Sequence, residues 1–159
     1  MRDLLFKTED FIFSYRVAGI LEHNGKLFLQ KYKEDYTFVG GHVLGMETHG
    51  DALKREFMEE IEANIGVDEL VAVGENFFTW DGTPWHQICF YYKVHLKGEN
   101  KLQMDGSFHG QDEWEDGTFD LDFCWIPVND LEKIHLIPKE ILPIILKNQG
   151  SIVHFISKE

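Results

Sequence analysis

Three glutamates and one arginine lie within six consecutive positions, at spacings typical of one face of a helix: Arg55, Glu56, Glu59 and Glu60. At 100° per residue, the three carboxylates fall within an arc of about 100°. Like charges three and four residues apart each cost a helix about 0.2–0.5 kcal/mol. The arrangement makes sense where a hard cation such as Mg²⁺ or Mn²⁺ binds the oxygens. The alternative is an acidic helix face that is merely solvated.

The residues just before this helix favour the metal site over the solvated face. Gly40 and Gly41 let the backbone approach other groups closely, and a carbonyl oxygen there could be a further ligand. Arg55 lies one turn before Glu59, so it can orient or partly neutralise that carboxylate. The spacing from Glu47 to Arg55 adds to the pattern.

The helix that would carry these carboxylates is predicted over Thr48–Ile61. Leu53, Phe57 and Ile61 recur at four-residue spacing and form the apolar stripe that would fix the helix to a sheet. A second helix is predicted over Pro138–Asn148, with Pro138 near its start. Pro143 lies inside that segment and is expected to shorten or kink it.

Several segments alternate or are rich in β-forming residues, and Asn24-Gly25 supplies a type I′ hairpin signal between the first two. The predicted strands are Ser14–His23, Lys26–Tyr32, Tyr36–Val43 (broken by Gly40-Gly41), Val67–Phe78, Ile88–Leu96, Phe123–Pro127 and Ser151–Ser157. No repeat or linker divides the chain, so residues 1–159 are expected to form one domain. The mixed order of hairpins and helices predicts an α+β fold or an α/β/α sandwich.

The composition limits the classes of partner. A formal net charge of −13 over 159 residues argues against binding long nucleic acid, which needs clustered Lys and Arg. An acidic protein that handles a phosphorylated ligand needs a positive group between them, usually a divalent metal. No apolar run is long enough to span a membrane. Cys89 and Cys124 lie among apolar neighbours and are expected to be buried free thiols, which suggests a cytoplasmic protein.

The acidic helix and the residues before it resemble the Nudix box, Gly-x5-Glu-x7-Arg-Glu-U-x-Glu-Glu-x-Gly-U, where U is a bulky aliphatic residue. The positions that match are Gly41, Glu47, Arg55, Glu56, Glu59 and Glu60. Two positions depart from the box, because Glu62 replaces its glycine and Ala63 replaces its last aliphatic residue. A third departure is Val39, where many relatives have proline. If the box glycine is a left-handed cap, Glu62 either costs about 1 kcal/mol there or extends the helix.

The resemblance implies a Nudix fold with a mixed β-sheet and a pyrophosphohydrolase that cleaves a phosphoanhydride. Its substrate would be a small nucleoside-diphosphate-linked molecule, such as a nucleoside triphosphate or an ADP-ribose-like compound. Glu56, Glu59 and Glu60, with a carbonyl at Gly40 or Gly41, would hold Mg²⁺, which Mn²⁺ could replace. Glu59 would be the first candidate for the general base, while Glu47 would pair with Arg55. Many members of the family dimerise, so a homodimer is compatible with the resemblance.

Other residues are candidates for a distant base or for substrate binding. Some Nudix relatives take a base or ligand from a distant acidic loop, and Glu113 or Glu115 would fill that role here, unless their segment is simply solvated. Trp80, Trp85 and His86 could stack on a base, or they pack within a hairpin. His42 could contact a phosphate, or it is a solvent-exposed histidine.

Three rival functions share the fold. The first is a non-catalytic Nudix-fold module that senses or binds a nucleotide, although such proteins usually lose box glutamates. The second is an isomerase resembling isopentenyl-diphosphate isomerase, which needs a catalytic cysteine outside the box. The third is an RNA-cap hydrolase, which the acidic composition disfavours.

Overall fold

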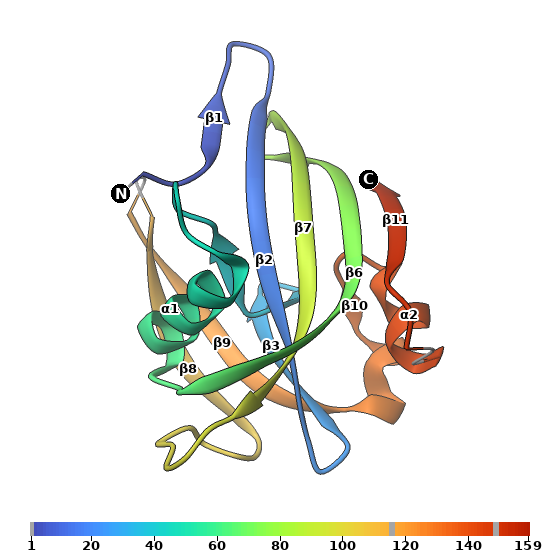
Figure 1. The fold of residues 1–159 in the computed structure, drawn as a ribbon. Coiled ribbons are helices and arrows are strands. Elements are labelled where there is room, and N and C mark those ends of the chain that lie inside the picture. Colours follow the sequence, from blue (N-terminus) through green and yellow to red (C-terminus); the bar gives the residue numbers. More distant parts are fainter. Residues whose placement is uncertain (1, 115–116, 148–149) are drawn as a thin grey trace.

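A mixed β-sheet forms the centre of the fold, with one helix packed on each of its faces (Figure 1). The computed structural model describes residues 2–114, 117–147 and 150–159, with the backbone alone at 111–114 and 117–119. The strands are β1 Leu5–Lys7, β2 Ile12–His23, β3 Lys26–Tyr32, β4 Asp35–Phe38, β5 Gly40–His42, β6 Ile65–Trp80, β7 Thr83–Leu96, β8 Ser107–Trp114, β9 Gly117–Pro127, β10 His135–Leu136 and β11 Val153–Lys158. The helices are α1 His49–Ile61, the 3₁₀ helix η1 Val128–Lys133 and α2 Ile141–Lys147.

Strand β2 joins the two halves of the sheet. It runs parallel to β7 on one side, and its other side pairs antiparallel with β1 and β5. Its last residues pair with β3, which continues to β4 and β9. The sheet therefore mixes parallel and antiparallel pairs, as the sequence predicts. Strand β5, which contains Gly40 and Gly41, pairs with β2 along its whole length.

Helix α1 forms where the sequence predicts it. The Thr48 side chain caps its first turn, because Oγ1 accepts a hydrogen bond of 3.2 Å from the backbone N–H of Asp51. Leu53, Phe57 and Ile61 are buried against the sheet. Glu62 does not extend the helix but adopts a left-handed conformation, with φ at 51°, and its N–H donates to the Met58 carbonyl. A non-glycine residue in that conformation costs about 1 kcal/mol.

The sheet separates two hydrophobic cores. The core on the α1 side contains Val17, Phe57 and Ala63, so the small residue in the last box position is fully buried. The core on the α2 side contains Ala18 and Ile141, together with both cysteines. Cys89 and Cys124 are free and buried, as expected from their apolar neighbours.

Two expectations about secondary structure are wrong. The second helix begins at Ile141 rather than Pro138, and Pro143 is its third residue. Proline is tolerated there because the N–H groups of a first turn have no intrahelical acceptor. The acidic segment that contains Glu113 was expected to be a loop. It is instead part of the β8–β9 hairpin, which is paired from Ser107↔Cys124 to Trp114↔Gly117.

None of the helices in the described ranges is both long enough and apolar enough to cross a membrane.

Candidate metal and active site

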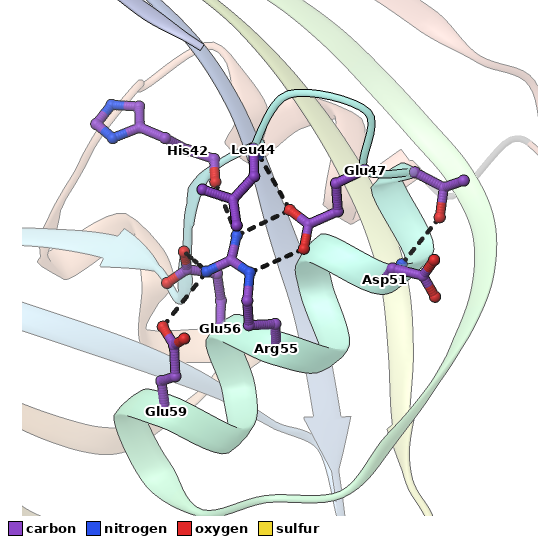
Figure 2. A network of polar contacts seen from close by, with 8 residues as sticks. His42, Leu44, Glu47, Asp51, Arg55, Glu56 and Glu59 are labelled. Atoms are coloured by element: carbon purple, nitrogen blue, oxygen red, sulfur yellow. Dashed lines mark hydrogen bonds and ion pairs between the residues drawn. The ribbon is translucent and has the colours of Figure 1, made fainter. Parts of the chain in front are cut away.

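Arg55 is the centre of a polar network between α1 and the turn that precedes it (Figure 2). Its Nε donates to Glu47 Oε2 at 2.8 Å and its Nη2 donates to Glu47 Oε1 at 2.9 Å. Nη2 also donates to the His42 carbonyl oxygen at 3.0 Å. Glu47 in turn accepts a hydrogen bond from the backbone N–H of Leu44. The network fixes the turn to the helix and the guanidinium to one position.

The remaining edge of the guanidinium meets two box carboxylates. Arg55 Nη1 lies 2.8 Å from Glu56 Oε1 and 3.3 Å from Glu59 Oε2. The Glu56 side chain is 13% exposed, whereas that of Glu59 is 60% exposed. Glu56 is thus held at the base of the site, and Glu59 stands at its solvent side.

Gly41 is the residue that brings the backbone against Glu56. A Cβ atom at position 41 would lie 2.3 Å from the Glu56 carboxyl carbon. A Cβ atom at Gly40 would lie 2.0 Å from the Val17 carbonyl oxygen. The contact at position 40 is with backbone, so a side chain there would force β2 and β5 apart, whereas a side chain at position 41 would displace the Glu56 carboxylate from the backbone.

The electrostatics of the site separate the carboxylates. Burial raises the pKa of Glu56, and the charge of Glu59 adds to this effect, while the Arg55 guanidinium opposes it. The hydrogen bonds from Arg55 lower the pKa of Glu47. The hydrogen bond to Glu47 and the contacts with Glu56 raise the pKa of Arg55 itself. The Arg55 guanidinium alone therefore pairs with Glu47, Glu56 and Glu59.

The donor set fits a divalent cation, although the side chains do not converge on one point as they stand. Within the described ranges, no three His, Cys, Asp or Glu side chains are arranged to hold a metal ion. Glu56 and Glu59 instead turn toward Arg55. The Glu60 side chain is half-buried on the same helix, with its Oε2 beneath the surface. Carboxylates clustered against a bare glycine backbone provide the oxygen ligands that Mg²⁺ and Mn²⁺ prefer.

The sequence model of the NUDIX domain matches residues 13–145, which include this whole network. The chain belongs to the Nudix family. No curated protein matches the chain.

Solved structures that resemble this Nudix chain cover most of it. The E. coli ORF135 protein is 22% identical, with a TM-score of 0.51 over 87% of this chain and 89% of its own. A UDP-X diphosphatase is 16% identical, with a TM-score of 0.58 over 96% of this chain and 69% of its own. An ADP-ribose pyrophosphatase from Streptococcus suis is 15% identical, with a TM-score of 0.56 over 89% of this chain and 98% of its own. At these identities the likeness is one of fold.

The aromatic residues predicted to bind the substrate lie in strands β6 and β7 rather than on the Nudix helix α1. Trp80 contacts Tyr32, Trp85 stacks on Phe78, and His86 lies 4.5 Å from Phe77 between ring centroids, so these aromatic groups contact rings of neighbouring strands. The predicted roles of these side chains in substrate binding remain predictions.

His42 lies in β5, beside the paired glycines. Its Nδ1 is 3.6 Å from Asp3 Oδ2, and its side chain is 28% exposed, so it is not the fully solvated histidine of the alternative. Burial, followed by the charge of Arg16, lowers the pKa of His42. Burial therefore favours the neutral form of the imidazole.

The candidates for a distant base fall largely outside the described residues. Glu113 contributes backbone to β8, but its side chain is outside the described part, as is the whole of Glu115. Their role stays a prediction.

Two groups near the Nudix box were not predicted from the sequence. His49, the first residue of α1, lies between two tyrosine hydroxyls, with Nε2 2.5 Å from Tyr15 Oη and Nδ1 2.7 Å from Tyr92 Oη. Arg16 lies in β2, opposite His42. A signal for Arg16 exists in the sequence, because a charged residue interrupts the apolar strand that leads into Val17 and Ala18.

Proposed function

We propose that this Nudix protein is a Mg²⁺-dependent pyrophosphohydrolase that cleaves the phosphoanhydride of a small nucleoside-diphosphate-linked molecule. Nucleoside triphosphates and ADP-ribose-like compounds are the substrate classes to test. The observation that carries the proposal is the contact between the Glu56 carboxylate and the Gly41 backbone, beside Glu59 and Arg55.

Glu56, Glu59 and Glu60, with a carbonyl oxygen of Gly40 or Gly41, are the groups that would hold the metal. When bound, Mg²⁺ polarises phosphoryl oxygens and lowers the pKa of water. Mn²⁺ could replace it, since both cations take oxygen ligands.

The other steps fall to the side chains themselves. Glu59 is the proposed general base, because it is exposed to solvent and Arg55 Nη1 contacts its Oε2. A carboxylate in this position can accept the proton of the attacking water. Arg55 positions Glu59 and Glu56, and Glu47 holds Arg55 through two hydrogen bonds. Glu47 is thus a positioning residue.

The decisive experiment is a panel of nucleotides incubated with Mg²⁺ in ¹⁸O-labelled water, with the products identified by mass. Incorporation of the label identifies which phosphorus the water attacks, and therefore which bond breaks. Glu59→Gln is expected to lower turnover by about 10²- to 10⁴-fold. Glu62→Gln is the matched control, since Glu62 is exposed in the cap after α1 and should leave turnover unchanged.

The result that contradicts the proposal is an absence of turnover on every compound by the wild-type protein with either metal. Nucleotide binding without turnover would instead support a sensing module with the Nudix fold.

A further inference from the structure

Arg16 lies beside the candidate metal site but on the other face of the sheet. In the β2–β5 pairing, Arg16 is opposite His42, and its neighbour Val17 is opposite Gly41. Val17 belongs to the core on the α1 side, and alternate residues of a strand point to opposite faces. The Arg16 side chain therefore points to the α2 side, one residue along the strand from the glycine that contacts Glu56.

The Arg16 guanidinium is poorly satisfied by the protein. Nη2 donates to the Phe38 carbonyl oxygen at 2.9 Å, and Nη1 donates to Cys89 Sγ at 3.7 Å. A guanidinium has five N–H donors, and a thiol sulfur is a weak acceptor. No Asp or Glu within the described ranges forms an ion pair with Arg16, and three of its N–H groups lack an acceptor there.

A charged group in this environment normally has a counter-charge. Arg16 is half-buried, and an enclosed charge is costly unless it is paired and hydrogen-bonded. Burial lowers the pKa of Arg16, but Cys89, Tyr91 and Glu60 together raise it, and the pKa lies above its usual value. Glu60 acts on this charge only through space, without a hydrogen bond to Arg16, so an anion from outside the chain would complete the hydrogen bonding of the guanidinium.

The box carboxylates lie within the electrostatic reach of Arg16. Its charge is among the influences that lower the pKa of Glu56, against the larger effect of burial, and it also lowers the pKa of His42. The strand register agrees with this proximity, because the next residue, Val17, pairs with Gly41, where an added Cβ would meet the Glu56 carboxylate.

The sheet face next to Arg16 is polar and partly aromatic. Gln87 Nε2 donates to Ser14 Oγ at 3.3 Å, and Asn76 Nδ2 donates to Gln87 Oε1 at 3.2 Å. Asn76 is 5% exposed, yet its Oδ1 has no hydrogen-bond partner among the described residues. Trp85, two residues before Gln87 and so on the same face, stacks on Phe78. Amide groups beside stacked rings suit a planar, polar group attached to a phosphate.

We propose that Arg16 binds the phosphoryl group of the substrate that faces away from the acidic helix. The inference rests on the proposed function, since it assigns one phosphate of the diphosphate to Arg16 and the other to the metal. Arg55 cannot take this role, because its Nε and Nη2 bind Glu47 and its Nη1 contacts Glu56 and Glu59. A guanidinium with free N–H groups binds phosphate through charge-assisted, often bidentate, hydrogen bonds.

The test uses methylenediphosphonate, a diphosphate whose P–C–P link cannot be hydrolysed. Its affinity in the presence of Mg²⁺ is measured by titration calorimetry for the wild type, Arg16→Met and Arg16→Lys. Arg16→Met is expected to weaken binding about 10- to 100-fold. Arg16→Lys should retain part of the affinity because it keeps the charge. Arg2→Met, at an exposed arginine, is the matched control and should bind as the wild type does.

Two readouts separate binding from a structural role. Arg16→Met should bind Mg²⁺ alone at least as tightly as the wild type does, because the substitution removes a cation that acts on Glu56. The ligand-free Tm of Arg16→Met should be equal to or above that of the wild type, since the substitution removes an incompletely paired charge. A lower Tm together with weaker Mg²⁺ binding would assign Arg16 to the structure and overturn the inference.

Unchanged affinity of Arg16→Met for methylenediphosphonate would also overturn it, as would no binding by the wild type. The inference and the proposed function can fail separately. If the wild type binds methylenediphosphonate through Arg16 but hydrolyses no nucleotide, the anion site is supported and the proposed hydrolase function is contradicted. If the wild type hydrolyses a nucleotide and Arg16→Met binds methylenediphosphonate as tightly as the wild type does, the hydrolase function is supported and the role of Arg16 is contradicted.

Discussion

Arg55 and Glu47 form a two-pronged ion pair, with Nε 2.8 Å from Oε2 and Nη2 2.9 Å from Oε1. Glu47 belongs to the turn before α1, whereas Arg55 lies on the helix itself. The pair leaves Nη1 as the edge that meets Glu56 and Glu59. Glu47, which is not one of the proposed metal ligands, therefore fixes the position of the Arg55 guanidinium. That guanidinium in turn orients Glu56 and Glu59.

Glu47→Gln is expected to lower the free energy of unfolding by about 1–3 kcal/mol, because it removes one charge from a half-buried, two-pronged pair. Urea unfolding at pH 7 measures the change. Glu59→Gln is the control, since its carboxylate is 60% exposed and an exposed pair contributes less than about 1 kcal/mol. Equal stability of Glu47→Gln and the wild type would show that the pair does not hold the turn.

The stabilisation from Glu47 should depend on pH. The hydrogen bonds from Arg55 lower its pKa in the folded state. For a carboxyl with a depressed folded pKa, the stabilisation is complete above the unfolded pKa of about 4.3 and is lost as the pH falls through the folded pKa. The difference in unfolding free energy between the wild type and Glu47→Gln should be constant from pH 7 to about 5 and shrink below about 4. If this difference in unfolding free energy grew as the pH fell, the pKa of Glu47 would be raised by folding rather than lowered.

Glu56→Gln should make the metal-free protein more stable at pH 7. Burial and then the charge of Glu59 raise the pKa of Glu56, although Arg55 opposes both. A carboxyl with a raised folded pKa costs stability above that pKa, and the cost vanishes as the pH falls below its unfolded value. The gain in unfolding free energy at pH 7 should therefore disappear in acid.

The same variant tests whether Glu56 holds the metal. At a Mg²⁺ concentration ten times its Kd, the wild-type Tm should rise by about 3–6 °C. Glu56→Gln should show no such rise, since a neutral amide is a weaker ligand for a hard cation. An equal rise in both proteins would place the cation elsewhere.

Gly41→Ala should weaken Mg²⁺ binding at least about 10-fold, because a Cβ atom 2.3 Å from the Glu56 carboxyl carbon forces that side chain away. Titration with Mg²⁺ and turnover on the best substrate both report the change. Gly50→Ala is the matched control, since a Cβ there meets nothing within 4 Å. That control lies in a helix and should gain about 0.5–1 kcal/mol of stability without altering metal binding. If the two alanine variants bind Mg²⁺ equally, the close approach of Gly41 to Glu56 has no functional role.

How far the sequence leads differs between the helix and the sheet. The α1 helix was predictable because Leu53, Phe57 and Ile61 give it a clear apolar stripe, and Thr48 caps it. The β8 strand was not, because its residues carry acids and glycine, which have low strand propensity, and its pairing with β9 is a tertiary effect. The predicted second helix begins too early, because Pro138 suits a first helical position, whereas the chain continues from β10 to Ile141 before the helix begins.

The candidate site divides in the same way. Local spacing along one helix predicts that Glu56, Glu59 and Glu60 share a face and that Arg55 can reach Glu59. It does not predict Arg16 or the tyrosines around His49, because β2 and β7 contribute them from positions 33 to 43 residues away from His49. Such groups become visible when the strand register is known.

His49 should make the stability of the fold pH-dependent. A neutral imidazole has one N–H and one acceptor nitrogen, so one of Tyr15 and Tyr92 donates to the ring and the other accepts. Burial lowers the pKa of His49 in the folded state. For a base with a depressed folded pKa, the unfolded chain binds more protons below about pH 6.5, so the stability contributed by His49 falls as the pH drops from 6.5 toward the folded pKa.

His49→Leu is therefore expected to cost about 1–3 kcal/mol at pH 7.5, since it leaves two tyrosine hydroxyls without their partner. The gap in unfolding free energy between the wild type and His49→Leu should narrow at pH 5.5. The remaining histidines are the same in both proteins, so the difference isolates His49. Tyr15→Phe and Tyr92→Phe complete a double-mutant cycle, and their costs should fail to add if the ring links the two hydroxyls. A gap that stays constant from pH 7.5 to 5.5, with additive tyrosine effects, would mean that His49 contributes through packing against Phe90 alone.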